Sequence, residues 1–247
     1  MSIPLIASFG GGVNSAAMLV GMQERNVYPQ AILFADTGGE KPETYTFLNQ
    51  MVGWLAQWGF PPITIVSNDG IHRTLERDCL TRNTMPSLVF GWRSCSDKYK
   101  RRPINKFIRS WGEVTMAVGI DAGETRRVGK NFDTESIKYW HPLIDWGWDR
   151  DACIAALNRA QLPIPVKSAC FFCPASKKTE VIQLSVEHPD LFARAVAMER
   201  AAVGLTAIKG LGRHWSWEEL VKNSETQRGL FPEVVQTPCI CFDGEED

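Results

Sequence analysis

Short apolar segments alternate with segments of helical periodicity along the first half of the chain. The apolar segments, each of which predicts a buried strand, are Ile3–Ser8, Ala31–Ala35, Ile63–Val66 and Val114–Ile120. Helices are expected between them, one from Ser15 and one that Pro42 opens at a first-turn position. Strands separated by helices form a parallel sheet with right-handed crossovers. The sequence therefore predicts the α/β class, with a twisted parallel sheet and helices on both faces.

Composition excludes several classes of protein. The 247 residues include 27 Lys and Arg against 28 Asp and Glu, and 44% are apolar. This balance is typical of a folded globular chain, and a formal net charge of −1 argues against broad, non-specific coating of nucleic acid. No apolar run approaches the roughly 18 residues of a membrane span, and the N-terminus lacks the features of a signal peptide. We expect a cytoplasmic protein with no membrane partner.

The chain changes character after about Tyr139. Three Trp residues and a Cys-x-x-Cys segment follow, and helices are expected over about Lys178–Leu184 and Pro189–Ala202. We therefore expect two units. Residues 1–138 form the α/β domain, and residues 139–247 form a mostly helical, cysteine-containing extension packed on it.

A glycine-rich turn, Gly10–Gly12, stands between the first strand and the first helix. Backbone amides and the positive end of the helix dipole converge there, which suits an anion such as phosphate. The common P-loop pattern fails, because no Lys-Ser or Lys-Thr pair follows, and a dinucleotide fingerprint has Ser15 at its third glycine position. A purely structural turn is the remaining alternative. Asn14 or Ser15 is expected to cap the first helical turn.

The same turn resembles the Ser-Gly-Gly-x-Asp-Ser loop of the PP-loop ATP pyrophosphatases, with Gly10 for the first Ser and Asn14 for the Asp. Further motifs resemble the phosphoadenylyl-sulfate (PAPS) reductase branch of that superfamily. They are Asp36-Thr37-Gly38 with Pro42-Glu43-Thr44, Cys95 with Lys100 and Pro103, Gly119-Ile120 with Glu124, Arg126 and Arg127, and Pro142-Leu143. The match covers roughly Ile3 to Ser176 and implies an adenine nucleotide alpha-hydrolase-like fold.

The resemblance implies that the protein binds ATP and Mg²⁺, cleaves ATP between the α and β phosphates, and adenylates a substrate from which sulfur then displaces AMP. The residues implied for nucleotide binding are Ser8, Gly10, Gly11, Gly12, Asn14, Ser15, Asp36, Thr37 and Gly38. The residues implied for catalysis are Asp36, which would hold the nucleoside or metal, and Lys100, Arg126 and Arg127, which would neutralise developing charge. The alternatives are a turn-capping role for Asp36 and a solvated basic face.

Cysteines suggest a metal centre. The spacing in Cys170-Phe171-Phe172-Cys173-Pro174 lets two thiolates bind one metal site, and four ligands could come from Cys95, Cys170, Cys173 and one of Cys239 and Cys241. Zinc and a [4Fe-4S] cluster both accept four cysteines. The resemblance favours the cluster, and a thioredoxin-like redox pair and buried thiols are the alternatives. Cys79 and Cys153 are expected to be packing residues.

The Glu-Cys-Gly-Leu-His-like segment with which sulfonucleotide reductases attack is absent from the sequence. The resemblance therefore points to the phage and DNA-modification members, with PAPS reductase activity or a non-catalytic nucleotide-binding module as alternatives. The implied partners are a nucleotide substrate, a sulfur donor such as a cysteine desulfurase, and a nucleic-acid acceptor. The sequence leaves open whether the acceptor is DNA, tRNA or a small molecule, and which oligomer forms. No role is assigned to His72, His141, His188 or His214.

Overall fold

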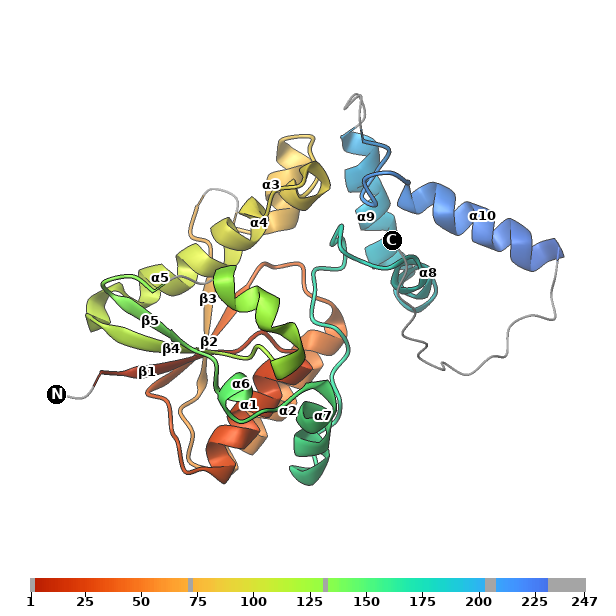
Figure 1. Ribbon diagram of the computed structural model, residues 1–247. Coiled ribbons are helices and arrows are strands. Elements are labelled where there is room, and N and C mark those ends of the chain that lie inside the picture. The colour runs from red at the N-terminus through yellow and green to blue at the C-terminus, as the bar shows by residue number, and fades with distance from the viewer. Residues whose placement is uncertain (1–2, 71–72, 131–132, 203–207, 231–247) are drawn as a thin grey trace.

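The computed structural model describes residues 3–70, 73–130, 133–202 and 208–230, and it contains one five-stranded sheet (Figure 1). Its strands are β1 (Leu5–Ser8), β2 (Ala31–Asp36), β3 (Ile63–Ser67), β4 (Val114–Val118) and β5 (Ile137–Trp140). Their order is β3-β2-β1-β4-β5, and every neighbouring pair is parallel. The prediction of a parallel α/β sheet is confirmed, although β5 was not expected from the sequence.

Helices cover both faces of the sheet, because alternate strand residues point to opposite sides. Ala7 packs in a core with α1 (Val13–Glu24), α2 (Pro42–Gln57) and α7 (Arg150–Arg159), whereas its neighbour Ile6 packs in a second core with Ile108. Ile108 ends α5 (Arg102–Ile108), which lies on the opposite face from α1 and α2 (Figure 1). As expected, Pro42 is at the start of α2.

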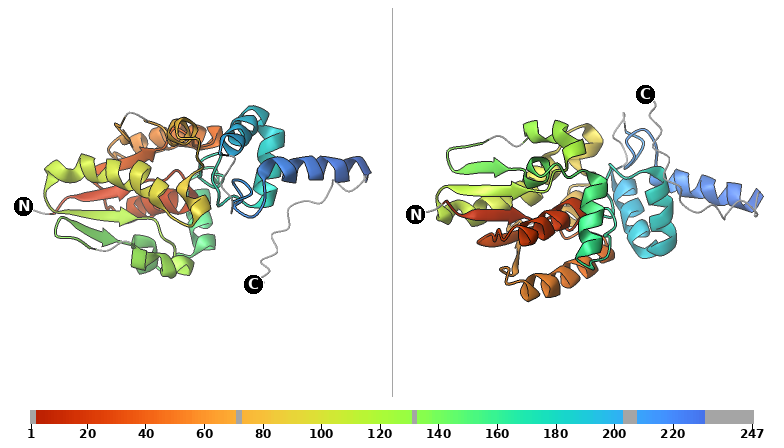
Figure 2. Two further views of the ribbon diagram at one scale, coloured as in Figure 1. Left: turned by 90° about the horizontal axis from the view of Figure 1, so that it is seen from above. Right: turned by 60° about the horizontal axis from the view of Figure 1, so that its bottom comes forward.

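A third apolar cluster joins the C-terminal helices to a segment that leaves the sheet after β3. The helices are α8 (Lys178–Glu187), α9 (Pro189–Ala201) and α10 (Trp217–Leu230), and the segment contains α3 (Leu75–Thr81) and the 3₁₀ turn η1 (Ser87–Phe90). Two further views show the three C-terminal helices grouped at one end of the molecule (Figure 2). The remaining short elements are α4 (Ser94–Ser96), the π turn η2 (Asp97–Arg101), η3 (Arg109–Trp111), η4 (Ala122–Lys130) and α6 (Pro142–Asp145).

The two expected units interleave along the chain. A division after residue 138 falls inside β5, and α7 packs against α1 in the core of the sheet domain. Conversely, Cys79 of α3 packs with the helices near the C-terminus. The chain therefore passes more than once between the apolar cores on the sheet and the third apolar cluster, which contains the C-terminal helices. None of the helices within the described ranges combines the length and the apolar character that crossing a lipid bilayer requires.

Candidate nucleotide site

A cavity of about 620 Å³ opens where the carboxyl ends of β1 and β4 lie side by side. The chain runs from β1 to β2 and β3 on one side and to β4 and β5 on the other, so the strand order reverses at this point. Ligands of open parallel sheets bind at such a switch point. The lining residues are Ser8, Gly10, Gly12, Val13, Asn14, Ser15, Lys100, Val118, Gly119, Glu124, Arg127, Arg150, Val166, Lys167 and Ser168.

Two glycines allow the cavity floor to form. Gly11 has a φ of +73°, and a Cβ there would lie 2.9 Å from Cγ2 of Thr44. A Cβ on Gly119 would lie 2.8 Å from the backbone of Asn14, so only a glycine lets the end of β4 approach the start of α1 this closely. The two glycines therefore allow the loop after β1 to lie against α2 and the end of β4 to lie against the start of α1.

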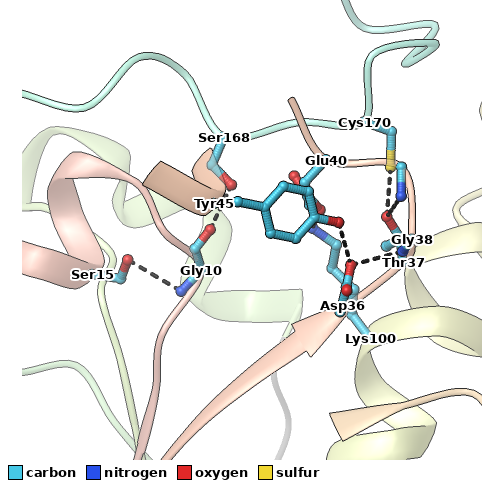
Figure 3. Close-up of polar contacts among 11 residues, drawn as sticks. Gly10, Ser15, Asp36, Thr37, Gly38, Glu40, Tyr45, Lys100, Ser168 and Cys170 are labelled. Atoms are coloured by element: carbon cyan, nitrogen blue, oxygen red, sulfur yellow. Dashed lines mark hydrogen bonds and ion pairs between the residues drawn. The ribbon is translucent and has the colours of Figure 1, made fainter. Parts of the chain in front are cut away.

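The first turn of α1 carries no side-chain cap, which corrects the expectation for Asn14 and Ser15. Gly12 occupies the N-cap position without a side-chain hydrogen bond. The Ser15 hydroxyl instead accepts a hydrogen bond from the Gly10 amide at 3.2 Å and donates one to the Gly12 carbonyl at 3.0 Å (Figure 3). The hydroxyl fixes the loop itself, and the amides at the helix start have no capping side chain that would compete with an anion.

Asn14 connects the loop to the segment after β4. Its Nδ2 donates to Oδ2 of Asp121 at 2.7 Å and to Oε2 of Glu124 at 3.3 Å, and its Oδ1 accepts from Arg150 at 3.2 Å. Asp121 is buried, with 4% of its surface exposed. An amide can serve two carboxylates in this way, whereas an aspartate could not donate to either.

Four basic side chains line the cavity, and sequence motifs identified two of them. Lys100 and Arg127 were expected, whereas Arg150 and Lys167 were not. Arg126, also expected, is exposed and does not line the cavity. Arg150 begins α7 and Lys167 lies in the irregular connector before the Cys-x-x-Cys segment, so only the tertiary structure brings them to the loop.

The connector also contacts the glycine loop directly. Ser168 donates a hydrogen bond from its hydroxyl to the Gly10 carbonyl (Figure 3), and its Cβ would lie 3.7 Å from a Cβ on Gly12. The C-terminal part of the chain thus completes one wall of the cavity. No motif in the sequence marks Ser168 for this position.

The loop after β2 lies outside the cavity. Oδ1 of Asp36 accepts hydrogen bonds from the Gly38 amide at 2.7 Å and from the Tyr45 hydroxyl at 2.9 Å (Figure 3). Burial and the nearby Asp36 carboxylate raise the pKa of Tyr45 well above its ordinary value, which keeps the hydroxyl a donor. Asp36, Thr37 and Gly38 are absent from the cavity lining, although Gly38 lines a separate cavity of about 390 Å³.

Lys100 lines the cavity of about 620 Å³ and also lies near the cysteines. Its Nζ lies 3.0 Å from Oε1 of Glu40, whose side chain is fully buried and whose second oxygen, Oε2, has no hydrogen-bond partner. Burial would lower the pKa of Lys100, but the charge of Glu40 and the Cys170 thiol outweigh burial and raise it. The Lys100 side chain therefore stays cationic. It lines the cavity and also lies near the segment that contains Cys170 and Cys173.

Cys170 contacts the loop after β2 through both its backbone and its side chain. Glu40 and Cys170 form an antiparallel bridge, and the Phe171 amide donates to the Gly39 carbonyl at 2.8 Å. The Cys170 sulfur lies 3.1 Å from the Thr37 hydroxyl (Figure 3). Among the described residues no strand of the sheet runs directly into Cys170, so the arrangement differs from that of a thioredoxin-like redox pair.

The other expected cysteine ligands within the described residues lie around the third apolar cluster, which joins α3 and η1 to the C-terminal helices. Cys95 and Cys173 pack against it, and burial raises the pKa of the Cys173 thiol, with a further contribution from Cys95. Cys79, expected to be a packing residue, is buried there but also lines a cavity of about 280 Å³ with Cys95. Burial raises the pKa of Cys79 to about 12, and Asp78 and Cys95 add to the effect.

Cys153 packs in the core of the sheet domain, and Cys239 and Cys241 lie outside the described residues. Among the side chains that the structure describes, no three cysteine sulfurs lie within 4.8 Å of one another. The structure thus brings Cys95, Cys170 and Cys173 to one region without closing a compact metal site.

A parallel sheet with a glycine loop at its switch point defines an α/β protein with a cavity at the strand ends, the position where ligands of such sheets bind. The family model described as the phosphoadenosine phosphosulfate reductase domain matches residues 4–154, and the chain belongs to this family. The resemblance inferred from the motifs is therefore confirmed.

Two solved structures are similar to the chain at low identity. The PAPS reductase from Candida auris, in a phosphate complex, has 16% identity and a TM-score of 0.49 over 67% of this chain and 76% of that chain. The U34-tRNA thiolase NcsA from Methanococcus maripaludis, with its [4Fe-4S] cluster, has 14% identity and a TM-score of 0.46 over 90% of this chain and 81% of that chain. Both of these proteins are enzymes. No curated protein sequence matches the chain significantly.

Proposed function

We propose that the protein is an ATP pyrophosphatase that activates an acceptor by adenylation and supports sulfur transfer to it. The observation that carries the proposal is the 620 Å³ cavity, in which an uncapped helix start faces Lys100, Arg127, Arg150 and Lys167. Backbone amides and several cations around one space suit the polyanionic triphosphate of ATP.

The reaction mainly requires the protein to position ATP and the acceptor and to neutralise the negative charge of the phosphates. An acceptor oxygen attacks the α-phosphorus of ATP, the bond to the β-phosphate oxygen breaks, and pyrophosphate leaves. The amides of the glycine loop hold the leaving pyrophosphate, and Lys100 and Arg127 stabilise the charge that develops on it. A sulfide ion from a donor then attacks the activated atom, a bond from sulfur to that atom forms, and AMP leaves with the electrons of the bond that breaks.

Magnesium fits the oxygen atoms next to the loop. Glu124 lines the cavity, and its Oε2 accepts a hydrogen bond from Nδ2 of Asn14, whose own carbonyl oxygen accepts one from Arg150. Mg²⁺ is commonly bound by one or two protein carboxylates together with substrate phosphates and water. Glu124 would hold the ion here together with the phosphates, and the ion would offset the negative charge of the β and γ phosphates.

A [4Fe-4S] cluster fits the cysteines better than zinc does. Four thiolates bound to one zinc at 2.3 Å are separated by only about 3.8 Å, which is closer than any three described sulfurs come. In a cluster each thiolate binds a different iron, so the sulfurs are further apart. Cys95, Cys170, Cys173 and one of Cys239 and Cys241 would hold the cluster, which supplies a site for accepting and passing sulfur.

Nucleic acid is the acceptor that the surface charge favours. Residues 73–109 contain ten Lys and Arg but only three Asp and Glu, although the whole chain has a formal charge of −1. The same segment contains Trp92, whose surface is 71% exposed, and Cys95. Clustered cations that contact phosphates, next to an exposed aromatic ring on which a base can stack, are typical of single-stranded nucleic-acid binding.

Pyrophosphate release tests the proposal. The full chain, loaded anaerobically with iron and sulfide, is incubated with ATP, Mg²⁺ and single-stranded RNA or DNA, and pyrophosphate is measured. We expect release from the unmodified protein and at least about a tenfold loss in Arg150→Gln, because a cation is removed from the cavity. Arg159→Gln is the matched control, since Arg159 ends the same helix but pairs with Glu24.

The same preparation distinguishes the two alternatives. Release of sulfite from a sulfonucleotide in the presence of thioredoxin, without pyrophosphate release from ATP, would identify a PAPS reductase. ATP binding without pyrophosphate release under any of these conditions would identify a nucleotide-binding module. Either result contradicts the proposed activity.

A further inference from the structure

Three metal-ligating side chains meet where α2 begins and α8 passes into α9, away from the cysteines. They are Glu43, Glu187 and His188, and their ligating atoms all lie within 4.8 Å of one another. Nε2 of His188 is 2.5 Å from Oε1 of Glu43. We propose that these three side chains hold a divalent transition-metal ion of the zinc type, which joins the sheet domain to the C-terminal helices.

The backbone fixes all three positions. Pro42 starts α2, so Glu43 stands in its first turn, and Pro189 starts α9 directly after the end of α8. The His188 amide donates to the Leu184 carbonyl at 2.9 Å, and the His188 carbonyl accepts a hydrogen bond from the Phe192 amide, one turn into α9, at 3.0 Å. A histidine held between two helices in this way has little backbone freedom, which lowers the entropic cost of using it as a ligand.

The donor atoms suit a transition metal. One imidazole nitrogen and two carboxylates are a ligand set for zinc and its neighbours, whereas Mg²⁺ and Ca²⁺ select oxygen alone. With a neutral imidazole the set carries two negative charges, which match a divalent cation. Gln183 donates a hydrogen bond to Glu187 at 2.9 Å and so orients one ligand from outside the set.

An unsatisfied atom provides an independent indication. Oε1 of Glu43 is paired with His188, whereas the Oε2 atom is itself buried and has no hydrogen-bond partner, although 37% of the Glu43 side chain is exposed. A buried carboxylate oxygen without a partner is unfavourable. An ion bound between Glu43 and Glu187 would give this oxygen a partner.

A simple ion pair between Glu43 and a protonated His188 is the competing explanation. Burial opposes ionisation of Glu43, but hydrogen bonds from His188 and from its own backbone amide, with the charges of His188 and Lys41, hold its pKa below the ordinary value. An ion pair accounts for that pKa, yet it leaves Oε2 of Glu43 without a partner and gives Glu187 no role. Metal binding separates the two explanations.

The position gives the ion a structural consequence. Glu43 follows Glu40 by three residues, and Glu40 forms the backbone bridge to Cys170. The ion would therefore add a further link between the loop after β2 and the part of the chain that contains the Cys-x-x-Cys segment.

Cobalt(II) is the probe, because cobalt bound to thiolates gives an intense charge-transfer band that cobalt bound to nitrogen and oxygen lacks. The metal-free, reduced full chain is titrated with Co²⁺, and Zn²⁺ is used to displace it. We expect one equivalent of cobalt without a thiolate band, present also in Cys173→Ser. His188→Ala and Glu187→Gln should each weaken this binding by about tenfold or more, since each removes a ligand.

Glu187 is exposed, so Glu187→Gln should fold even if His188→Ala does not. His214→Ala and Glu219→Gln replace exposed residues of the same types outside the set and should bind cobalt as the unmodified protein does. Zn²⁺ should also raise the Tm of the unmodified protein and of these controls more than that of Glu187→Gln. The proposal is overturned if Glu187→Gln retains full affinity, or if all bound cobalt shows a thiolate band and disappears in Cys173→Ser.

Discussion

Nδ2 of Asn14, in the first turn of α1, donates a 2.7 Å hydrogen bond to Oδ2 of Asp121, beyond the end of β4. This contact spans the switch point of the sheet, where the nucleotide cavity opens. Asn14 stands where the PP-loop pattern has an aspartate, and the structure shows an amide whose two donor hydrogens are matched to the carboxylates of Asp121 and Glu124. The replacement of the pattern's aspartate by Asn14 is therefore matched by the neighbouring carboxylates of Asp121 and Glu124, which accept hydrogen bonds from its amide.

Restoring the aspartate should destabilise the protein. In Asn14→Asp, a third carboxylate replaces the donor to Asp121 and Glu124, so two hydrogen bonds are lost and like charges meet. We expect the free energy of unfolding to fall by about 1–3 kcal/mol without Mg²⁺, and part of this loss to be recovered with Mg²⁺. Urea unfolding with and without Mg²⁺ measures both effects. Asn158→Asp, at an exposed position on α7, should change little, and equal stability of the two variants would contradict this account of Asn14.

A methyl group at position 119 should close the cavity. In Gly119→Ala the new Cβ would meet the backbone of Asn14 and Ser15 at 2.8 Å, and backbone atoms cannot move aside as a side chain can. We expect a cost of about 1–3 kcal/mol in stability and loss of ATP binding measured by calorimetry. Gly53→Ala is the control, because nothing lies within 4 Å of its Cβ and alanine favours the helix α2. Normal ATP affinity in Gly119→Ala would show that the two strand ends do not form the nucleotide site.

Lys100 should be required for the stability of the fold, because it is the cation that pairs with the buried Glu40 carboxylate. Lys100→Met leaves the fully buried Glu40 side chain without its cation. Removing one partner of a buried pair costs about 3–5 kcal/mol, and we expect a value below this, about 2–3 kcal/mol, because 37% of the Lys100 side chain is exposed. Glu40→Gln on its own should cost less, since solvent can still reach the ammonium group.

The double variant Lys100→Met with Glu40→Gln distinguishes pairing from packing. It should be more stable than the sum of the single changes implies, by about 1 kcal/mol or more, because the uncompensated charge is gone. Urea unfolding of the four proteins gives this coupling energy. Strict additivity would mean that the 3.0 Å contact between Lys100 and Glu40 contributes no stability of its own.

Trp92 should bind nucleic acid without contributing to the fold. Because its surface is 71% exposed, Trp92→Ala should leave the urea midpoint unchanged. Loss of one stacked base should weaken binding of a single-stranded oligonucleotide by about 1–3 kcal/mol, which fluorescence anisotropy at fixed salt measures. Trp58→Ala, at a 43% exposed position after α2, is the control. Equal oligonucleotide affinity of Trp92→Ala and the unmodified protein would remove Trp92 from the binding surface.

The sheet could be predicted because its strands are locally apolar and its turns contain glycine. Four strands and the start of α2 at Pro42 agree with the sequence patterns. β5 was not predicted, because Ile137–Trp140 alternates weakly and a lysine interrupts it. α10 was also not predicted, since its long-range packing on Trp217 leaves little periodicity in the sequence. Local pattern predicts an element only where burial follows a regular period.

The site was only partly predictable for a similar reason. Motifs identified the glycine loop, Lys100 and Arg127, because each lies in a short run of residues that resembles a motif of the family. Arg150, Lys167 and Ser168 are far from the loop in sequence, with 136 residues between Asn14 and Arg150 and 158 between Gly10 and Ser168. Only the packing of α7 and of the connector brings them to the cavity. The placement of Cys79 beside Cys95 likewise depends on how α3 folds back, which no local pattern encodes.

The products of ATP cleavage test the central claim most directly. Phosphorus NMR of the cluster-loaded protein with ATP, Mg²⁺ and a single-stranded acceptor separates the two modes of cleavage. We expect pyrophosphate to form in step with AMP or an adenylated acceptor, and we expect neither product from Gly119→Ala. Formation of ADP and phosphate, or no change in ATP at enzyme concentrations that saturate the acceptor, would contradict the assignment of this cavity to α–β cleavage.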